Sequence, residues 1–266
     1  MQKDGRVPVQ FDRPPVIEVA CGVAFTLPKP LKTAHIGLYW SRVRDEFPRC
    51  DDASPIAMVV EGQGTPDSIG YDVQVQPVAL PPVRRVWLIN AEGTHLVQLQ
   101  EDRFLFNWKR TGDDSSYPSY MNVVAGFREQ WSRYKEFLAS EGLGPPTPLQ
   151  LEMTYFNFWP GGRAWLRDHQ REETGERFLE APEAVDWKVV HNLPDSRGRL
   201  HISAASARHA ATSEKGIRLD LTARGLPRDL SDASCEQWFD LAHEWITQGF
   251  ADITTADAHK AWGRTA

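Results

Sequence analysis

The first hydrophobic pattern along the chain is an alternation with a period of two residues. In residues 16–25, "VIEVACGVAF", one face carries apolar side chains and the other carries Glu18 among small residues; the apolar face holds Ile17, Val19, Cys21, Val23 and Phe25. This alternation predicts a strand with one buried face. The two prolines that precede it disfavour a helix and favour an extended approach to the strand.

Three other segments follow the spacing of three and four residues that is typical of an amphipathic helix. They cover residues 33–47, with Thr33 as the expected N-cap, residues 120–140, with Ser116 or Ser119 as the N-cap, and residues 234–250, where Ser234 and Gln237 form a capping-box pattern. A short helix is expected near the end of the chain, capped by Thr254 or Thr255.

Short segments with strand composition fill most of the remaining chain. Strands are expected at residues 56–62, 71–80, 84–90, 94–100, 103–110, 149–159, 185–192, 199–208 and 216–225, with hairpins at "NAEG" and "QED". Residues 163–180 are polar and predict a partly helical segment.

The order strand, helix, strands, helix occurs twice. "PPVIEV" near the start is echoed by "PLQLEM" after residues 141–148, a stretch rich in Gly and Pro. We therefore expect two pseudo-repeated halves, residues 1–144 and 145–266, that form one continuous globular unit. The predicted fold class is α+β, an antiparallel sheet with helices on one face. The topology is like that of the TATA-binding protein or, alternatively, like a helix-grip fold.

Composition narrows the possible functions. The chain has 266 residues, 41% of them hydrophobic, and a formal net charge of -6, so its overall field does not favour nucleic acid or an anionic membrane. No apolar run is long enough to span a membrane, and the N-terminus has no signal-peptide core. The three cysteines are expected to be reduced. The sequence thus favours a cytoplasmic protein without membrane association.

Glu18 and Glu152 occupy corresponding positions in the two halves. One hypothesis is a pair of carboxylates for acid–base catalysis or cation binding. The interpretation we favour is that both are solvated or ion-paired on the open face of the sheet. The cations available for such pairs are Arg84, Arg85, Lys188 and Arg218.

No motif assigns a catalytic residue, a metal or a cofactor. His243 and Glu244 resemble the start of a zinc-protease helix, but position 247 is Thr where a second His is needed. His243 is therefore expected to flank the apolar stripe and to hydrogen-bond a neighbour. A triad of Ser203, His201 and Asp186 has no nucleophile elbow to support it.

Two aromatic motifs have structural explanations. "RFLFNW", residues 103–108, has the aromatic and basic mixture of single-strand nucleic-acid binders, but its aromatic residues alternate and are expected to face the core. Tyr117, in "YPSY" before the second helix, is expected to hydrogen-bond near the helix start while its ring packs.

Several strings together resemble a sporadically distributed prokaryotic family of uncharacterised proteins. They are "PPVIEVACGVAF", "HIGLYWSRVRDEFP", "YPSY", "LEMTYFNF" and "AHEWITQGFADITTADAHKAWGR". The resemblance extends over residues 11–264 and brings no catalytic residues with it. It implies an accessory gene of the kind found in mobile elements and antiviral defence.

The sequence thus leads to three hypotheses of function. The first is a non-enzymatic protein-interaction module of a defence or toxin–antitoxin system, whose partner is another protein bound at the open face or at the sheet edges. The second is nucleic-acid binding on an open face that is locally basic. The third is a small-ligand binder or enzyme with a cavity between sheet and helix. The oligomeric state is left open.

Overall fold

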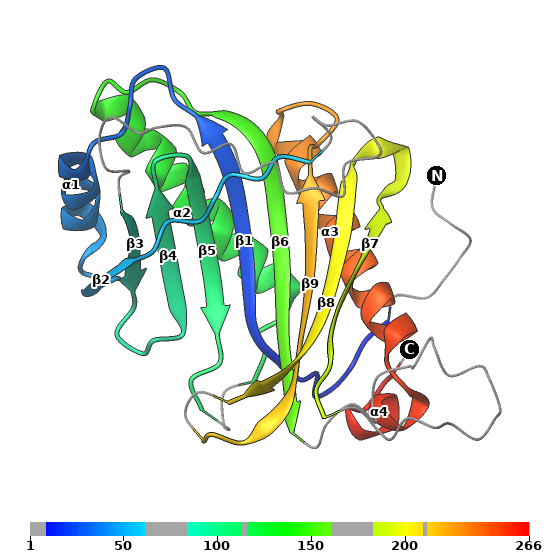
Figure 1. The fold of residues 1–266 in the computed structure, drawn as a ribbon. Helices are drawn as coiled ribbons and strands as arrows, with labels where there is room; N and C mark the ends of the chain where they lie inside the picture. The colour runs from blue at the N-terminus through cyan, green and yellow to red at the C-terminus, as the bar shows by residue number, and fades with distance from the viewer. Residues whose placement is uncertain (1–8, 62–83, 113–115, 161–182, 210–211, 266) are drawn as a thin grey trace.

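The computed structural model describes residues 9–61, 84–112, 116–160, 183–209 and 212–265. Within these residues the chain forms one nine-stranded antiparallel sheet in the order β2-β3-β4-β5-β1-β6-β9-β8-β7 (Figure 1). The strands are β1 (Val16–Thr26), β2 (Arg49–Ala53), β3 (Arg85–Ile89), β4 (His95–Gln100), β5 (Arg103–Lys109), β6 (Thr147–Pro160), β7 (Asp186–Asn192), β8 (Gly198–Arg208) and β9 (Lys215–Gly225).

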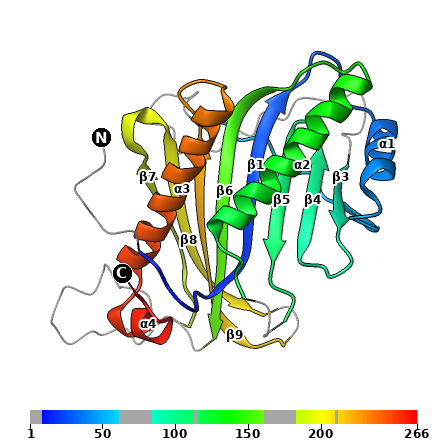
Figure 2. The ribbon, with the colours of Figure 1, turned by 180° about the vertical axis from the view of Figure 1, so that it is seen from behind.

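The long helices lie on one face of this sheet, as Figure 2 shows. Helix α2 (Tyr120–Ser140) packs on β5 and β1, and α3 (Asp232–Ile253) packs on β6, β9 and β8. The shorter α1 (Thr33–Val43) lies beside α2, and α4 (Ala256–Ala261) follows α3. The predicted α+β fold with an antiparallel sheet and helices on one face is confirmed.

The strand order is symmetric about the centre of the sheet. The first strands of the two halves, β1 and β6, pair at the centre, and the last strands, β5 and β9, flank them. The halves thus share one sheet, and each half contributes one long helix. This arrangement differs from a helix-grip fold, in which the strands wrap a single helix. The sequence duplication itself stays a prediction. The segments expected at residues 71–80 and 163–180 lie outside the described residues.

The core lies between the sheet and the helices and is rich in aromatic rings. Phe104 of β5 packs against Trp131 and Tyr134 of α2, with ring centroids 5.3 and 5.2 Å away. Gly126 lets α2 approach β5 closely, because a Cβ there would lie 2.6 Å from the ring of Phe106. The alternating aromatics of β5 therefore face the core, as predicted.

A β-bulge changes the start of β1. The register between β1 and β6 shifts between Val16 and Glu18, so Val16 belongs to the core cluster and Ile17 does not. The extra residue reverses the alternation on the N-terminal side of the bulge. The expectation that Ile17 faces the core was therefore wrong.

The helix starts also differ in part from expectation. Ser231 is the N-cap of α3 and accepts a hydrogen bond from the Ser234 amide, so the proposed Ser234–Gln237 box is not the cap. Lys32, not Thr33, is the N-cap of α1. Ser119 caps α2 through its backbone alone at φ 98°, a conformation that is strained for a residue with a side chain. Thr255 caps α4 as predicted.

Candidate functional site on the open face of the sheet

The face of the sheet away from α2 and α3 carries the polar side chains of the strands, and we call it the open face. Residues 54–61, which we call the strap, follow β2 and cross this face from the first half to the second (Figure 1). A strand was expected at residues 56–62, but the described part of this segment pairs with no strand. The composition of this segment suits a strand, but the segment crosses the strands of the sheet and does not run alongside one of them.

Two glutamine side chains hold the backbone of the strap. Gln100 of β4 accepts a hydrogen bond from the Ile56 amide and donates one to the Ile56 carbonyl, both at 2.8 Å. Gln150 of β6 accepts from the Glu61 amide and donates to the Val59 carbonyl, again at 2.8 Å. Each primary amide thus bonds the extended chain as a neighbouring peptide group would. These four contacts do not depend on the side chains of the strap.

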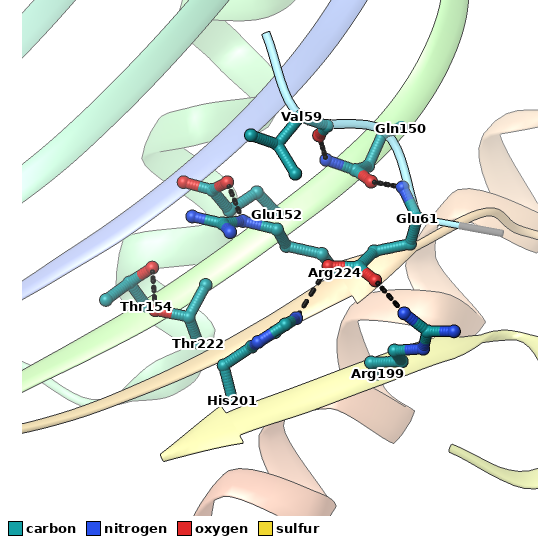
Figure 3. Close-up of polar contacts among 9 residues, drawn as sticks. All are labelled: Val59, Glu61, Gln150, Glu152, Thr154, Arg199, His201, Thr222 and Arg224. Carbon is teal, nitrogen blue, oxygen red and sulfur yellow. Dashed lines mark hydrogen bonds and ion pairs between the residues drawn. The ribbon is translucent and has the colours of Figure 1, made fainter. Parts of the chain in front are cut away.

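The strap ends in a charged cluster on the second half of the sheet (Figure 3). The Glu61 carboxylate lies 2.6 Å from Nε2 of His201 and 3.3 Å from Nη1 of Arg199, both on β8. Only 5% of the Glu61 side chain is exposed. Burial raises the pKa of Glu61, but the hydrogen bond and charge of His201, with Arg199 and Arg224, bring it below its usual value. The cluster therefore favours a bound carboxylate.

The neighbouring strands complete the floor of this cluster. Nε of Arg224 on β9 donates to the Glu152 carboxylate at 2.6 Å, and the hydroxyls of Thr154 and Thr222 are 3.0 Å apart (Figure 3). These polar groups bond one another across β6 and β9, so the floor has hydrogen bonds of its own besides those to the strap.

Apart from Glu61, the side chains of the strap are poorly buried. Met58 and Val59 are 36% and 44% exposed although both are apolar. The strap is therefore held by backbone hydrogen bonds and one carboxylate rather than by a hydrophobic core. Segments with few buried apolar contacts open at low free-energy cost.

A second polar network crosses the first half of the open face. Arg85 donates to Gln98, Gln98 donates to Asn107, and Asn107 donates to the Glu18 carboxylate at 2.5 Å. Gln98 and Asn107 are buried. Burial is the main cause that raises the pKa of Glu18, against the Asn107 hydrogen bond and the charges of Lys109 and Arg218.

The structure brings some of the predicted open-face residues together and separates others. Glu18, Phe156 and Asp220 are successive neighbours across β1, β6 and β9, and Lys188 of β7 continues this line beyond Ser203. Arg218 binds Asp220 at 2.9 Å and lies over the Phe156 ring.

Glu18 and Glu152 do not form a carboxylate pair. They lie on either side of the Ala20–Thr154 pair, because Glu152 is opposite Gly22, and four residues of strand cover about 13 Å. Arg84 precedes β3 and binds Asp52 at 2.8 Å at the edge of the sheet. Asp52 is the neighbour of the core residue Val86, so this ion pair lies on the side of the helices.

The catalytic arrangements considered from sequence do not form in the described part of the chain. His201 binds Glu61, and no hydrogen bond joins it to Ser203 there. Within the described residues no group of three His, Cys, Asp or Glu side chains is placed to hold a metal ion. No described helix is long and apolar enough to cross a membrane. Cys21, Cys50 and Cys235 are free thiols.

Comparison with known proteins adds no identification. No protein-family model matches this chain, and no curated protein is significantly similar to it.

Sequence reasoning missed the residues that hold the strap. Gln150 lies two positions before Glu152 and so on the same strand face, which is the one signal that could have placed it beside a predicted site residue. Glu61 lies near the end of a segment that the sequence predicts to be a strand, and no motif marks it as a binding group. Arg199 and Arg224 follow the alternation of β8 and β9 but carry no motif.

Proposed function

We propose that the open face binds an extended segment of a partner protein that carries an acidic side chain. In the isolated chain the strap occupies this site. The observation that supports the proposal is the set of contacts from Gln100 and Gln150, which bind backbone, together with the cluster that receives Glu61. Extended peptides are commonly recognised in this way, with backbone bonds for affinity and a side-chain site for specificity.

The spacing of these contacts suits an extended peptide laid across the strands. Gln100 and Gln150 come from β4 and β6, which are three strand intervals or about 14 Å apart. Four residues of extended chain, from Ile56 to Val60, cover about 13 Å. A partner segment with its acidic residue five positions after the first bonded residue would match both glutamines and the cluster.

Nucleic-acid binding has less support, because cations of this face are engaged by acids of the same chain. Arg218 binds Asp220, Arg224 binds Glu152, and Arg199 binds Glu61. Affinity for a phosphate backbone comes largely from cations that displace counterions. Membership of a defence or toxin–antitoxin assembly remains a prediction from the resemblance.

The test uses a fluorescent peptide with the sequence of residues 54–62, SPIAMVVEG, acetylated and amidated, followed by fluorescence anisotropy. The wild-type strap competes at an effective concentration in the millimolar range, so the peptide should bind weakly. Glu61→Gln weakens the strap and should bind the peptide at least about tenfold more tightly than wild type, since hydrogen bonds to charged groups contribute about 1.5–3 kcal/mol. Glu129→Gln, an exposed change on α2, is the matched control and should behave as wild type.

A second peptide with Gln in place of its Glu should bind Glu61→Gln at least about tenfold more weakly than the first. Adding His201→Ala to the Glu61→Gln protein should remove most of this preference, because His201 makes the shortest contact with the carboxylate. Equal binding of both peptides, or equal binding by Glu61→Gln and Glu129→Gln, would contradict the proposal.

A further inference from the structure

A cavity of about 450 Å³ lies on the opposite side of the sheet, in the layer of the helices. Its walls come from the segment at residues 9–14, the start of α2, strand β6 and the middle of α3; Figure 2 shows both helices on this side. The volume falls in the range of small-molecule sites, which hold mostly apolar walls and a few polar groups.

Three of the polar side chains that line the cavity form one hydrogen-bonded chain. The Tyr117 and Tyr155 hydroxyls are 2.8 Å apart, and the Tyr155 hydroxyl is 2.9 Å from Nδ1 of His243. Tyr120 stacks on the His243 ring at 4.1 Å and donates to Asp240 at 2.7 Å, which fixes the position of the imidazole. All of these except Asp240 line the cavity.

His243 is neutral at physiological pH, because burial lowers its pKa to about 4. When Tyr117 donates to Tyr155 and Tyr155 donates to Nδ1, the ring proton lies on Nε2. Nε2 forms no hydrogen bond with the described residues. Because His243 lines the cavity, Nε2 is available there as a hydrogen-bond donor in this tautomer.

No Lys, Arg, Asp or Glu is among the described residues that line the cavity. A charged ligand would lose hydration there without gaining an oppositely charged partner. We propose that the cavity binds a neutral, largely apolar small molecule whose single oxygen accepts a hydrogen bond from Nε2 of His243. This inference is independent of the function proposed for the open face.

The test uses prodan, a neutral naphthalene ketone whose emission shifts to the blue in a dry site, and its analogue with a CH2 group in place of the carbonyl, 6-propyl-2-dimethylaminonaphthalene. Wild type should bind prodan about tenfold more tightly than the analogue, as expected for one hydrogen bond. His243→Phe should lose this tenfold preference and keep its affinity for the analogue.

Two variants block the cavity from different walls. Met121→Trp changes a side chain that lines the cavity and is 68% exposed, and Thr247→Trp does the same from α3. Both should lower prodan affinity at least tenfold. Leu38→Trp, at a 47% exposed position of α1 outside the lining, is the matched control and should bind as wild type.

Circular dichroism and thermal melting identify any variant that fails to fold. If only one of the two blocking variants folds, its prodan affinity is the one compared with wild type. Failure of wild type to bind prodan would overturn the proposal, because prodan has the size, neutrality and single oxygen that it requires. Wild-type affinity in both folded blocking variants would overturn it as well. A prodan preference that survives His243→Phe would overturn the assignment of the donor.

Discussion

The contact between α2 and β5 can be tested with two glycines in helix interiors. Replacing a helical glycine with alanine favours the helix by about 0.8–1.0 kcal/mol where the methyl group meets nothing. Gly37 of α1 has no atom within 4 Å of its would-be Cβ, so Gly37→Ala should raise the free energy of unfolding by about 0.5–1 kcal/mol.

Gly126 of α2 offers the same helical gain, but its methyl group would lie 2.6 and 2.7 Å from two ring carbons of Phe106. Normal contacts between carbons are about 3.5–4.0 Å, so helix and sheet must separate by about 1 Å. Phe106 is buried between β5 and α2 and cannot turn into solvent. Such overpacking costs about 1–3 kcal/mol, which leaves Gly126→Ala about 0–2 kcal/mol less stable than wild type.

Urea unfolding followed by circular dichroism measures both variants under one set of conditions. The difference between them should be about 1–3 kcal/mol. Phe106→Leu should make Gly126→Ala less costly, and a double-mutant cycle gives the coupling. If Gly126→Ala stabilises the protein as much as Gly37→Ala, α2 does not lie this close to the sheet and the description of the helix layer is wrong.

The remaining predictions concern two buried titratable groups. The pKa of Glu18 is raised in the folded protein. This carboxyl therefore lowers the free energy of unfolding as the pH rises above the ordinary pKa of a glutamate. Glu18→Gln should therefore be as stable as wild type or more stable at pH 7, whereas Glu18→Ala leaves the Asn107 amide unpaired and should lose about 1–3 kcal/mol in urea unfolding. A large loss in Glu18→Gln would instead indicate an ion pair. The pKa of His243 is about 4 in the folded protein and 6.5 in the unfolded chain. Between pH 6.5 and pH 4 the unfolded chain therefore binds a proton that the folded protein does not. Wild type should lose stability relative to His243→Phe as pH falls through this window, by at most about 3 kcal/mol. Parallel stability profiles from pH 7 to 4 would contradict the burial of this ring.

The sequence patterns predicted the layers of the fold because each layer depends on local periodicity. The core face of β5 and the stripes of α2 and α3 follow from periods of two and 3.6 residues. The bulge at Ile17 was not predicted, because one extra residue reverses a strand face without changing the composition. The path of the strap was not predicted for a related reason, since a segment of strand-like composition has the same sequence pattern whether it pairs in the sheet or crosses it.

The candidate site could be predicted only in part. The alternation of apolar and polar residues predicts that Glu152 and Arg218 lie on the open face. It also predicts that this face is exposed to solvent, but Gln98 and Asn107 on the same face are buried. The residues that hold the strap come from β4, β6 and β8 and are separated by up to 140 positions from the groups that they bind. Such long-range contacts leave no local signal. His243 was expected to hydrogen-bond a neighbour, and its bond to Tyr155 confirms this.

The segment at residues 9–14 is joined to the other end of the described chain. Asp12 and Arg13 donate backbone hydrogen bonds to the carbonyls of Gly263 and Trp262, and Thr265 donates to Gln10. This segment is also a wall of the cavity. During synthesis on the ribosome, residues 9–14 must therefore wait for residues 262–265 before this wall has its hydrogen-bond partners. Ligand uptake by nascent chains of increasing length would then report the completion of the fold, because chains that stop before residue 262 lack the partner of this wall.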